Sequence, residues 1–240
     1  MSWPFDEFVP SRDFDTAEYG RLLRELHKFH GALAWAALSR ADTIHLREAL
    51  TALRSRLHAM RTDIDSAPYG QLDDLPCHGL GQLPAWRATH ETETTLHATF
   101  EFTRWHIGGG GAAHGGMVTA VLDDAMGSCA SSRGRVPVRT AYLNTTFRAL
   151  TPVEVPLEVV VSVTKTEGRK LFVHGEIRHG QDICAEADGL FVIVTSDERR
   201  REPARAVTSA AAEGSGTLDG RAHASPAGQA PPMARSCPSQ

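Results

Sequence analysis

Hydrophobic residues recur every three or four positions through residues 16–60, which is the spacing of helices with one apolar face. Asp15 or Thr16 stands where an N-terminal cap is expected, and a break near Ser39–Thr43 divides the pattern in two. We therefore expect two helices in this part of the chain. Their apolar positions are Leu22, Leu23, Leu26, Phe29, Leu33, Ala36 and Ala37 before the break, and Ile44, Leu50, Leu53 and Leu57 after it.

A linker rich in turn-forming residues, 66–84, follows, and beyond it the hydrophobic period becomes that of strands. Apolar and polar residues alternate over 95–102, and the small apolar segment 113–132 is long enough for a helix. Four further strand-like segments, 138–148, 157–166, 170–178 and 183–195, are separated by Thr151-Pro152, Glu167-Gly168 and His179-Gly180. One helix followed by an unbroken series of strands predicts an α+β fold with an antiparallel sheet.

The end of the chain has a different composition. Beyond Asp197 it consists mainly of Ala, Gly, Ser, Pro and Arg, which is typical of a disordered tail. We therefore expect three parts: a helical extension with its linker over 1–87, an α+β domain over 88–196, and a disordered C-terminal tail over 197–240.

Composition narrows the class of protein. The net charge of −4 over 240 residues argues against nucleic acid as the main partner. Four scattered cysteines without a C-x-x-C pair argue against a disulfide scaffold and fit a reducing compartment. The first residues lack the layout of a signal peptide, and the longest uncharged stretch, 105–122, holds six glycines. We expect a cytoplasmic protein without a membrane span.

The most informative stretch is a run of four glycines, 108–111, followed by His114-Gly115-Gly116 at the start of the expected helix. A dinucleotide fingerprint does not fit, because His114 takes the last glycine position counted from Gly109. A P-loop does not fit either, because Met117 follows Gly116 where lysine is required. The backbone N–H groups of such a helix start attract an anion or the oxygen of a polarised carbonyl group.

Two carboxylates, Asp123 and Asp124, follow within the same otherwise apolar helix. A buried carboxylate is unfavourable unless it is paired or used in chemistry, although an aspartate here could also cap a shorter helix or face water. Gly115 and Asp123 are eight residues apart, about 12 Å along one helix. Two antiparallel copies across a two-fold axis would bring them together, so a real site requires a dimer with two shared sites.

These residues resemble a known family. His114-Gly115-Gly116, Asp123 and Thr140–Phe147 are similar to the hotdog-fold acyl-CoA thioesterases, in the branch of the phenylacetate-pathway and mammalian mitochondrial enzymes. The resemblance covers about 88–196 and continues through Leu150-Thr151-Pro152, Glu167–Lys170 and Cys184–Phe191. It implies an antiparallel sheet wrapped around a central helix, in a homodimer or a homotetramer built as a dimer of dimers. Gly108–Gly111 replaces the family's frequent Gly-Pro-Pro-Gly, which suggests a looser turn.

The resemblance also implies catalytic roles. The backbone N–H of Gly115 would polarise the thioester carbonyl, and Asp123 of the facing protomer would act as general base or nucleophile. Thr140 would position the attacking water, and His114 would shape the turn or contact the substrate. Asp124 is the alternative catalytic carboxylate. The expected substrate-binding residues are Gly116, Asp124, Asn144, Arg148, Arg169 and Lys170. On a regular strand Thr140, Tyr142, Asn144 and Thr146 share one face, with Leu143 and Phe147 packed opposite.

Coenzyme A carries phosphates, so basic residues are expected near the site. Residues 133–170 hold seven basic and three acidic side chains, within a chain of net charge −4. Arg169 and Lys170 are the preferred phosphate ligands because they follow a turn. We expect no cofactor beyond the substrate's coenzyme A, and no metal, since His27 and His30 lack a third ligand at a convincing spacing.

The function expected from the sequence is hydrolysis of an acyl-CoA thioester to a free acid and coenzyme A. The alternative is a non-catalytic hotdog module that binds acyl-CoA, and a hotdog dehydratase ranks third.

Overall fold

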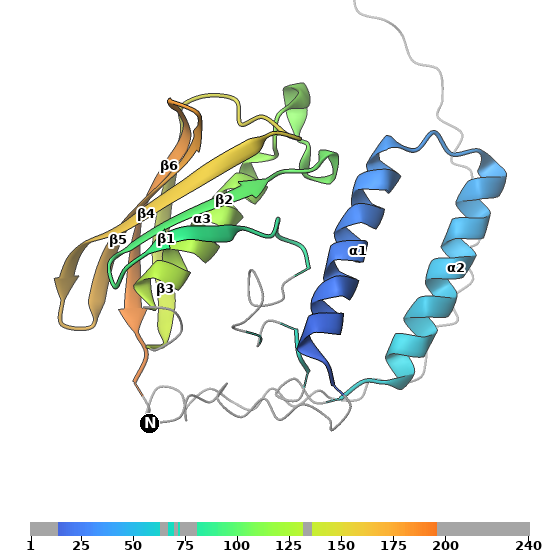
Figure 1. Cartoon of the computed structure of the whole chain (residues 1–240), viewed down its shortest axis with the longest axis horizontal. Coiled ribbons are helices and arrows are strands. Elements are labelled where there is room, and N and C mark those ends of the chain that lie inside the picture. The colour runs from blue at the N-terminus through green and yellow to red at the C-terminus, as the bar shows by residue number, and fades with distance from the viewer. Residues whose placement is uncertain (1–13, 63–66, 70–71, 73–80, 132–135, 196–240) are drawn as a thin grey trace, which may run out of the picture. The chain divides into compact units, whose positions relative to one another are not determined.

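A computed structural model describes residues 14–62, 67–69, 72, 81–131 and 136–195. Two helices precede a six-stranded sheet, and a third helix packs against that sheet (Figure 1). The helices are α1 (Thr16–Trp35), α2 (Arg40–Ala59) and α3 (Gly115–Ala130), with short 3-10 turns η3 (Arg104–His106) and η4 (Gly109–Gly111). The strands are β1 (Arg87–Glu91), β2 (Thr95–Glu101), β3 (Val138–Phe147), β4 (Pro156–Glu167), β5 (Lys170–His179) and β6 (Asp182–Ile193).

The sheet has the strand order β1-β2-β4-β5-β6-β3, and every neighbouring pair is antiparallel. The α+β fold expected from the sequence is therefore confirmed, and five of the six strands lie where the hydrophobic pattern placed them. β1 was not predicted, because four of its five residues are exposed and it carries no apolar alternation. The expected tail over 197–240 and most of the expected linker lie outside the described residues.

α3 lies across one face of the sheet and supplies the centre of the core. Val118, Val121, Leu122, Ala125 and Met126 of this helix are buried almost completely. Strands β5 and β6 carry glycines where the helix crosses them, because a Cβ on Gly175 would lie 2.9 Å from Met126 Cγ. The close approach of helix and sheet at this point therefore requires glycine.

β3 forms one edge of the sheet and contains a bulge. Thr140 is opposite Phe191 of β6 and Tyr142 is opposite Leu190, so Ala141 is an extra residue without a partner. Directly opposed residues share a face of the sheet, and Phe191 is buried beneath α3. Thr140 therefore faces α3, whereas Tyr142 faces away from it.

The bulge overturns one expectation from the sequence. Thr140 was expected to share a face with Tyr142, Asn144 and Thr146, and this is wrong. Thr140 shares the α3 side with Leu143 and Phe147, which are opposite Gly189 and Ala185. The strict two-residue alternation fails here because the extra residue shifts the phase of the strand by one position.

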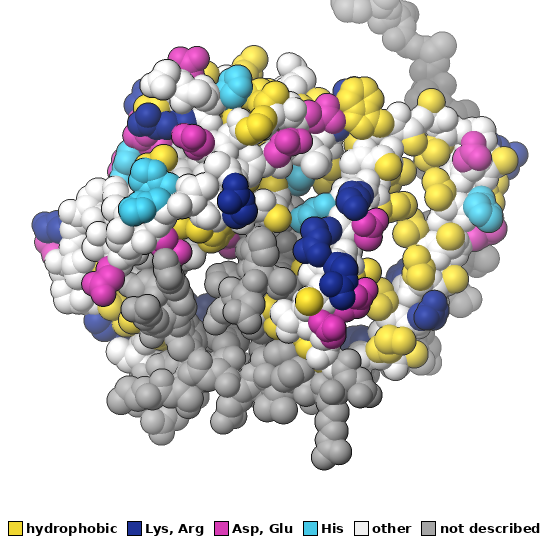
Figure 2. Space-filling model, in the orientation of Figure 1, with side chains coloured by type: hydrophobic (Ala, Val, Ile, Leu, Met, Phe, Trp, Pro, Cys, Tyr) yellow, Lys and Arg dark blue, Asp and Glu magenta, His cyan; other side chains and the backbone are white. Residues whose placement is uncertain are grey.

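Both N-terminal helices are capped at their first turn, and the cap of α1 is Asp15, one of the two residues expected. Asp15 accepts a hydrogen bond of 3.0 Å from the backbone N–H of Glu18, and Ser39 with Asp42 forms a capping box at the start of α2. α2 buries none of its residues. Figure 2 shows hydrophobic side chains along both helices, and Leu53 and Leu57 of α2 are 52% and 66% exposed.

α1 contacts the α+β domain at η3. Trp35 Nε1 donates a hydrogen bond of 2.8 Å to Glu154 Oε1, and the Arg104 guanidinium lies 3.7 Å from the centre of the Trp35 ring. The ring of His30 stacks on that of Trp105 at a centroid distance of 4.5 Å. These contacts join α1 to the segment that leads into the glycine run. Within the described residues, no helix combines the length and hydrophobicity needed to cross a membrane.

Candidate active site

The glycine run forms a closed loop ahead of α3. Ile107 and Ala113 make an isolated antiparallel bridge, and the N–H of Gly108 donates a hydrogen bond of 2.7 Å to the carbonyl of Ala112. Gly110 and Gly111 have φ angles of 69° and 80°, a region that glycine occupies without strain. The turn that was expected to be loose is therefore held by backbone hydrogen bonds at its base.

His114 caps α3. Its Nδ1 accepts a hydrogen bond of 3.0 Å from the N–H of Gly116. The neutral imidazole then carries its proton on Nε2. The preceding backbone is fixed as well, because the N–H of His114 donates a hydrogen bond of 2.7 Å to the carbonyl of His106.

The two glycines after His114 differ in what their N–H groups can do. The Gly116 N–H is occupied by the imidazole of His114, although Gly116 was expected to bind substrate. The Gly115 N–H finds no acceptor among the described residues. Gly115 is the first residue of a 16-residue helix, so its amide lies at the positive end of the helix dipole. It is the better placed of the two to bind a carbonyl oxygen.

A pocket of about 370 Å³ opens at this end of α3. Its lining includes Gly108, Ala112, His114, Gly115, Phe147 and Leu150. Asp123 and Thr140 do not line this pocket. Within one chain, the proposed amide donor and the proposed base therefore serve different places, as the spacing of eight residues along the helix requires.

Asp123 and Thr140 meet at the middle of α3. Thr140 Oγ1 donates a hydrogen bond of 2.9 Å to Asp123 Oδ1, and the Asp123 side chain is half-buried between the apolar faces of the helix. Thr140 reaches Asp123 because it is opposite Phe191 on the α3 side, and the extra residue Ala141 explains why Tyr142, two positions later, faces away. Two of the residues implied as catalytic by the resemblance are thus brought together.

Asp124 has a different partner. Trp86 Nε1, just before β1, donates a hydrogen bond of 2.7 Å to Asp124 Oδ2. Sequence reasoning missed Trp86, and the one signal that could have found it is that the indole N–H of a partly buried tryptophan needs an acceptor. The acceptor could not be inferred, because it lies 38 residues further along the chain. Each of the two carboxylates therefore has its own side-chain donor, Thr140 for Asp123 and Trp86 for Asp124.

The two described cysteines do not offer a nucleophile. Cys129 and Cys184 are both buried free thiols. Burial, with a smaller contribution from Glu91, raises the pKa of Cys129 to about 11, and burial also raises the pKa of Cys184. Both thiols are therefore protonated near neutral pH, and thiolate chemistry is disfavoured.

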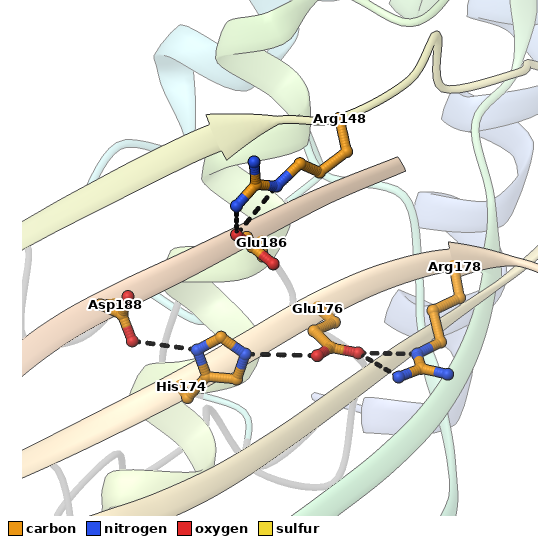
Figure 3. Close-up of polar contacts among 6 residues, drawn as sticks. All are labelled: Arg148, His174, Glu176, Arg178, Glu186 and Asp188. Carbon is orange, nitrogen blue, oxygen red and sulfur yellow. Dashed lines mark hydrogen bonds and ion pairs between the residues drawn. The ribbon is translucent and has the colours of Figure 1, made fainter. Parts of the chain in front are cut away.

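The basic residues expected to bind substrate do not cluster within one chain. Arg148 follows β3 at its Phe147 end and pairs with Glu186, with Nε 3.0 Å from Oε1 (Figure 3). Lys170 is opposite Val192 at the other end of β6, and Arg169 Nη1 donates to the carbonyl of Ile193 at 3.1 Å. Asn144 is opposite Asp188 on the face of the sheet away from α3.

An ion-pair network covers that outer face (Figure 3). His174 lies between Asp188, at 2.9 Å, and Glu176, at 3.3 Å, and Arg178 Nε donates to Glu176 Oε2 at 2.7 Å. Burial alone would lower the pKa of His174, but the hydrogen bonds to Asp188 and Glu176 outweigh it and raise that pKa. The side-chain nitrogen and oxygen atoms through which His174, Glu176 and Glu186 could bind a metal ion lie within 4.8 Å of one another. Arginines already pair with both glutamates, so the cluster is an ion-pair network in which these carboxylates have cationic partners.

Comparisons with known proteins agree with the resemblance. Residues 110–186 match the family model of the thioesterase superfamily. The chain is 34% identical over 84 residues to acyl-coenzyme A thioesterase THEM4 of Bos taurus, covering 34% of each protein. It is 36% identical over 84 residues to the Mus musculus protein of that name, covering 34% of this chain and 36% of that one. The chain thus matches about a third of the length of these relatives.

A solved structure extends the comparison to most of the chain. Protein RHA08564, described as a thioesterase superfamily protein, superposes with a TM-score of 0.62 and 21% identity. The match covers 77% of this chain and 97% of that one. The likeness confirms the hotdog fold.

Proposed function

We propose that this protein, whose sheet and α3 have the hotdog fold of the thioesterase superfamily, hydrolyses acyl-CoA thioesters to a free acid and coenzyme A. The observation that carries the proposal is the hydrogen bond from Thr140 Oγ1 to Asp123 Oδ1. It holds a half-buried carboxylate in one orientation on an apolar helix. Among the described residues Asp123 Oδ2 accepts no hydrogen bond, so this oxygen is available to a water molecule.

The chemistry follows from two groups. The Gly115 N–H donates to the thioester carbonyl oxygen and stabilises the negative charge that develops there, a contribution worth about 10²–10³ in kcat in known enzymes. Asp123 Oδ2 takes a proton from water while the water oxygen bonds to the carbonyl carbon. The tetrahedral intermediate then breaks its C–S bond, and the coenzyme A sulfur leaves as a thiolate that takes up a proton.

A nucleophilic route uses the same residues. Asp123 would attack the carbonyl carbon, expel the thiolate and form an anhydride that water then hydrolyses. Water that opens the anhydride at the Asp123 carbonyl leaves ¹⁸O in the Asp123 carboxylate after a single turnover in H₂¹⁸O, a result that the general-base route cannot give. Water that opens it at the acyl carbon puts the label in the product acid, as the general-base route does.

The proposed active unit is a dimer, or a dimer of dimers, in which Gly115 of one chain faces Asp123 of the other. β3 supports this, because its only strand partner among the described residues is β6, which leaves its other edge unpaired. Tyr142 and Phe147 on this edge strand are 44% and 54% exposed. An antiparallel pairing of two β3 strands would join the sheets about a two-fold axis.

We assign the coenzyme A phosphates to the β4–β5 turn. Gly168 has a φ of 58°, so the turn that presents Arg169 and Lys170 is a tight one. Arg148, also expected to bind substrate, already pairs with Glu186 through its guanidinium. We also place the protein in a reducing, cytoplasmic compartment, which suits the free thiols of Cys129 and Cys184.

The test is release of free thiol from short, long and aromatic acyl-CoAs by the purified protein. Asp123→Ala and Asp123→Asn should lower kcat by about 10²–10⁴-fold and leave the oligomer folded. Tight acyl-CoA binding without thiol release by the unaltered protein would instead favour a non-catalytic binding module. Full activity in both Asp123 variants would refute the assignment of the base.

A further inference from the structure

Phe147, the last residue of β3, lies directly over the first residue of α3. It is opposite Ala185, whose side chain is buried, so its ring faces the helix. A Cβ added to Gly115 would lie 3.1 Å from Phe147 Cζ and 3.4 Å from its Cε1. The ring therefore rests against the residue whose N–H we assign to the thioester carbonyl.

The same ring forms a wall of the pocket at the start of α3. Leu150, which is 74% exposed, lines this pocket as well, and the other walls are mainly glycine and alanine. Among the described residues of the lining, His114 and Thr151 supply the polar side chains and none bears a permanent charge. Such a surface suits an apolar group and offers nothing to the phosphates of coenzyme A. The pocket is therefore on the acyl side of the thioester.

We propose that Phe147 is the specificity-determining residue of this site and excludes acyl groups that branch next to the thioester carbonyl. The inference rests on the proposed thioesterase function and names its substrate class, straight-chain acyl-CoAs. A carbonyl oxygen bound to the Gly115 N–H places the second carbon of the acyl group beside the Phe147 ring. A methyl group on that carbon competes with the ring for space, whereas a methyl group at the far end of a chain does not.

The experiment compares butyryl-CoA with 2-methylpropanoyl-CoA, which have the same atoms but differ in branching at the second carbon. Phe147→Ala should raise the ratio of kcat/KM for the branched over the straight substrate at least about tenfold, the scale of one methyl group in a hydrophobic pocket. Phe147→Leu, which retains more of the side-chain volume, should give a smaller rise and serves if the alanine variant does not fold.

Tyr142→Ala is the matched control. Tyr142 is an exposed aromatic residue on the same edge strand, but it faces away from α3. Its loss should leave the ratio within about twofold of the unaltered value, while sedimentation reports the oligomeric state of every variant. A change in the oligomeric state alone would alter kcat/KM for both substrates by the same factor, so the ratio of the two values would stay the same.

The outcomes separate the two proposals. If the unaltered protein releases thiol and the Phe147 variants keep its substrate ratio, the specificity role is wrong and the thioesterase function stands. An equal loss of activity on both substrates also overturns the specificity role, because the Phe147 ring would then only hold Gly115 in position. If the unaltered protein hydrolyses no acyl-CoA, both proposals fail.

Discussion

Thr140 Oγ1 donates a hydrogen bond of 2.9 Å to Asp123 Oδ1, and the donor comes from the edge strand while the acceptor comes from the central helix. The contact leaves one carboxylate oxygen for water and restrains the rotation of the side chain. It also means that the geometry of the proposed base depends on the position of β3, the strand that would lie at the subunit interface.

Thr140→Val should lower kcat by roughly ten- to a hundredfold, because a hydrogen bond to a charged group contributes about 1.5–3 kcal/mol. The unfolding free energy should fall by at most the same amount, because the valine has a similar shape and only the hydrogen bond is lost. Thr140→Ser keeps the hydroxyl and should retain most of the activity. Steady-state thiol release measures the effect, and a valine variant as active as the serine variant would show that the hydroxyl has no part in catalysis.

Trp86→Phe removes the indole N–H that donates to Asp124 Oδ2. The half-buried carboxylate loses its partner, so the unfolding free energy should fall by about 1–3 kcal/mol while kcat stays within a few-fold of its unaltered value. Urea denaturation and thiol release measure the two quantities. Asp124→Asn is the companion variant. If it loses activity as completely as Asp123→Asn, then Asp124 is the base and the roles of the two carboxylates are reversed.

Deletion of Ala141 removes the bulge and restores regular alternation to β3. Thr140 and Tyr142 then become consecutive residues that stay opposite Phe191 and Leu190, so Thr140 still faces α3 and keeps its contact with Asp123. We expect the deletion variant to lose less activity than Thr140→Val, and Ala141→Gly, which keeps the residue count, to retain full activity. Steady-state thiol release measures both variants. A deletion variant as impaired as Thr140→Val would mean that the local twist of the bulge is needed to bring Thr140 to Asp123.

The stability of the outer face should depend on pH through His174. Its pKa is raised in the folded state, so its stabilising contribution is complete below the ordinary histidine value of 6.5 and is lost as pH rises through the folded pKa. The urea midpoint of the unaltered protein relative to His174→Gln should therefore fall from pH 6 to pH 8. An unchanged difference between those pH values would show that the network does not favour the protonated imidazole.

Other histidines change the stability of the fold with pH in the opposite direction. The comparison with His174→Gln is needed to separate the contribution of His174 from theirs. Burial, the largest cause, lowers the pKa of His106, and nearby His27 and His30 lower it further. Burial also lowers the pKa of His30. Groups of this kind stabilise the fold above their ordinary pKa and lose that contribution as the pH falls.

Much of the fold could be predicted because its signals are local. The period of the hydrophobic residues located α1, α2, α3 and five strands, and the cap at Asp15 follows from a side chain within three residues of the helix start. β1 escaped because its residues have no apolar alternation. It is defined by its pairing with β2, a contact that the local sequence does not encode.

The residues of the candidate site also fall into those that local sequence predicts and those that it does not. His114, Gly115 and Asp123 could be found because one helix carries them at fixed spacing. The partners of Asp123 and Asp124 could not, since Thr140 and Trp86 reach them from 17 and 38 residues away. Alternation alone predicted the wrong face for Asn144 relative to Thr140, because a bulge leaves no mark on the hydrophobic pattern of a strand this exposed.

The extra residue at Ala141 has a consequence for comparing this chain with others. An alignment with a protein whose corresponding strand lacks the bulge needs a one-residue gap at this point of β3. Without that gap, either Thr140 or everything from Tyr142 onward is matched to residues of the opposite face. Residue identities before and after Ala141 should therefore be scored as two separate blocks of the alignment. Whether a relative has a hydroxyl that faces the residue equivalent to Asp123 should be judged only in the block before Ala141.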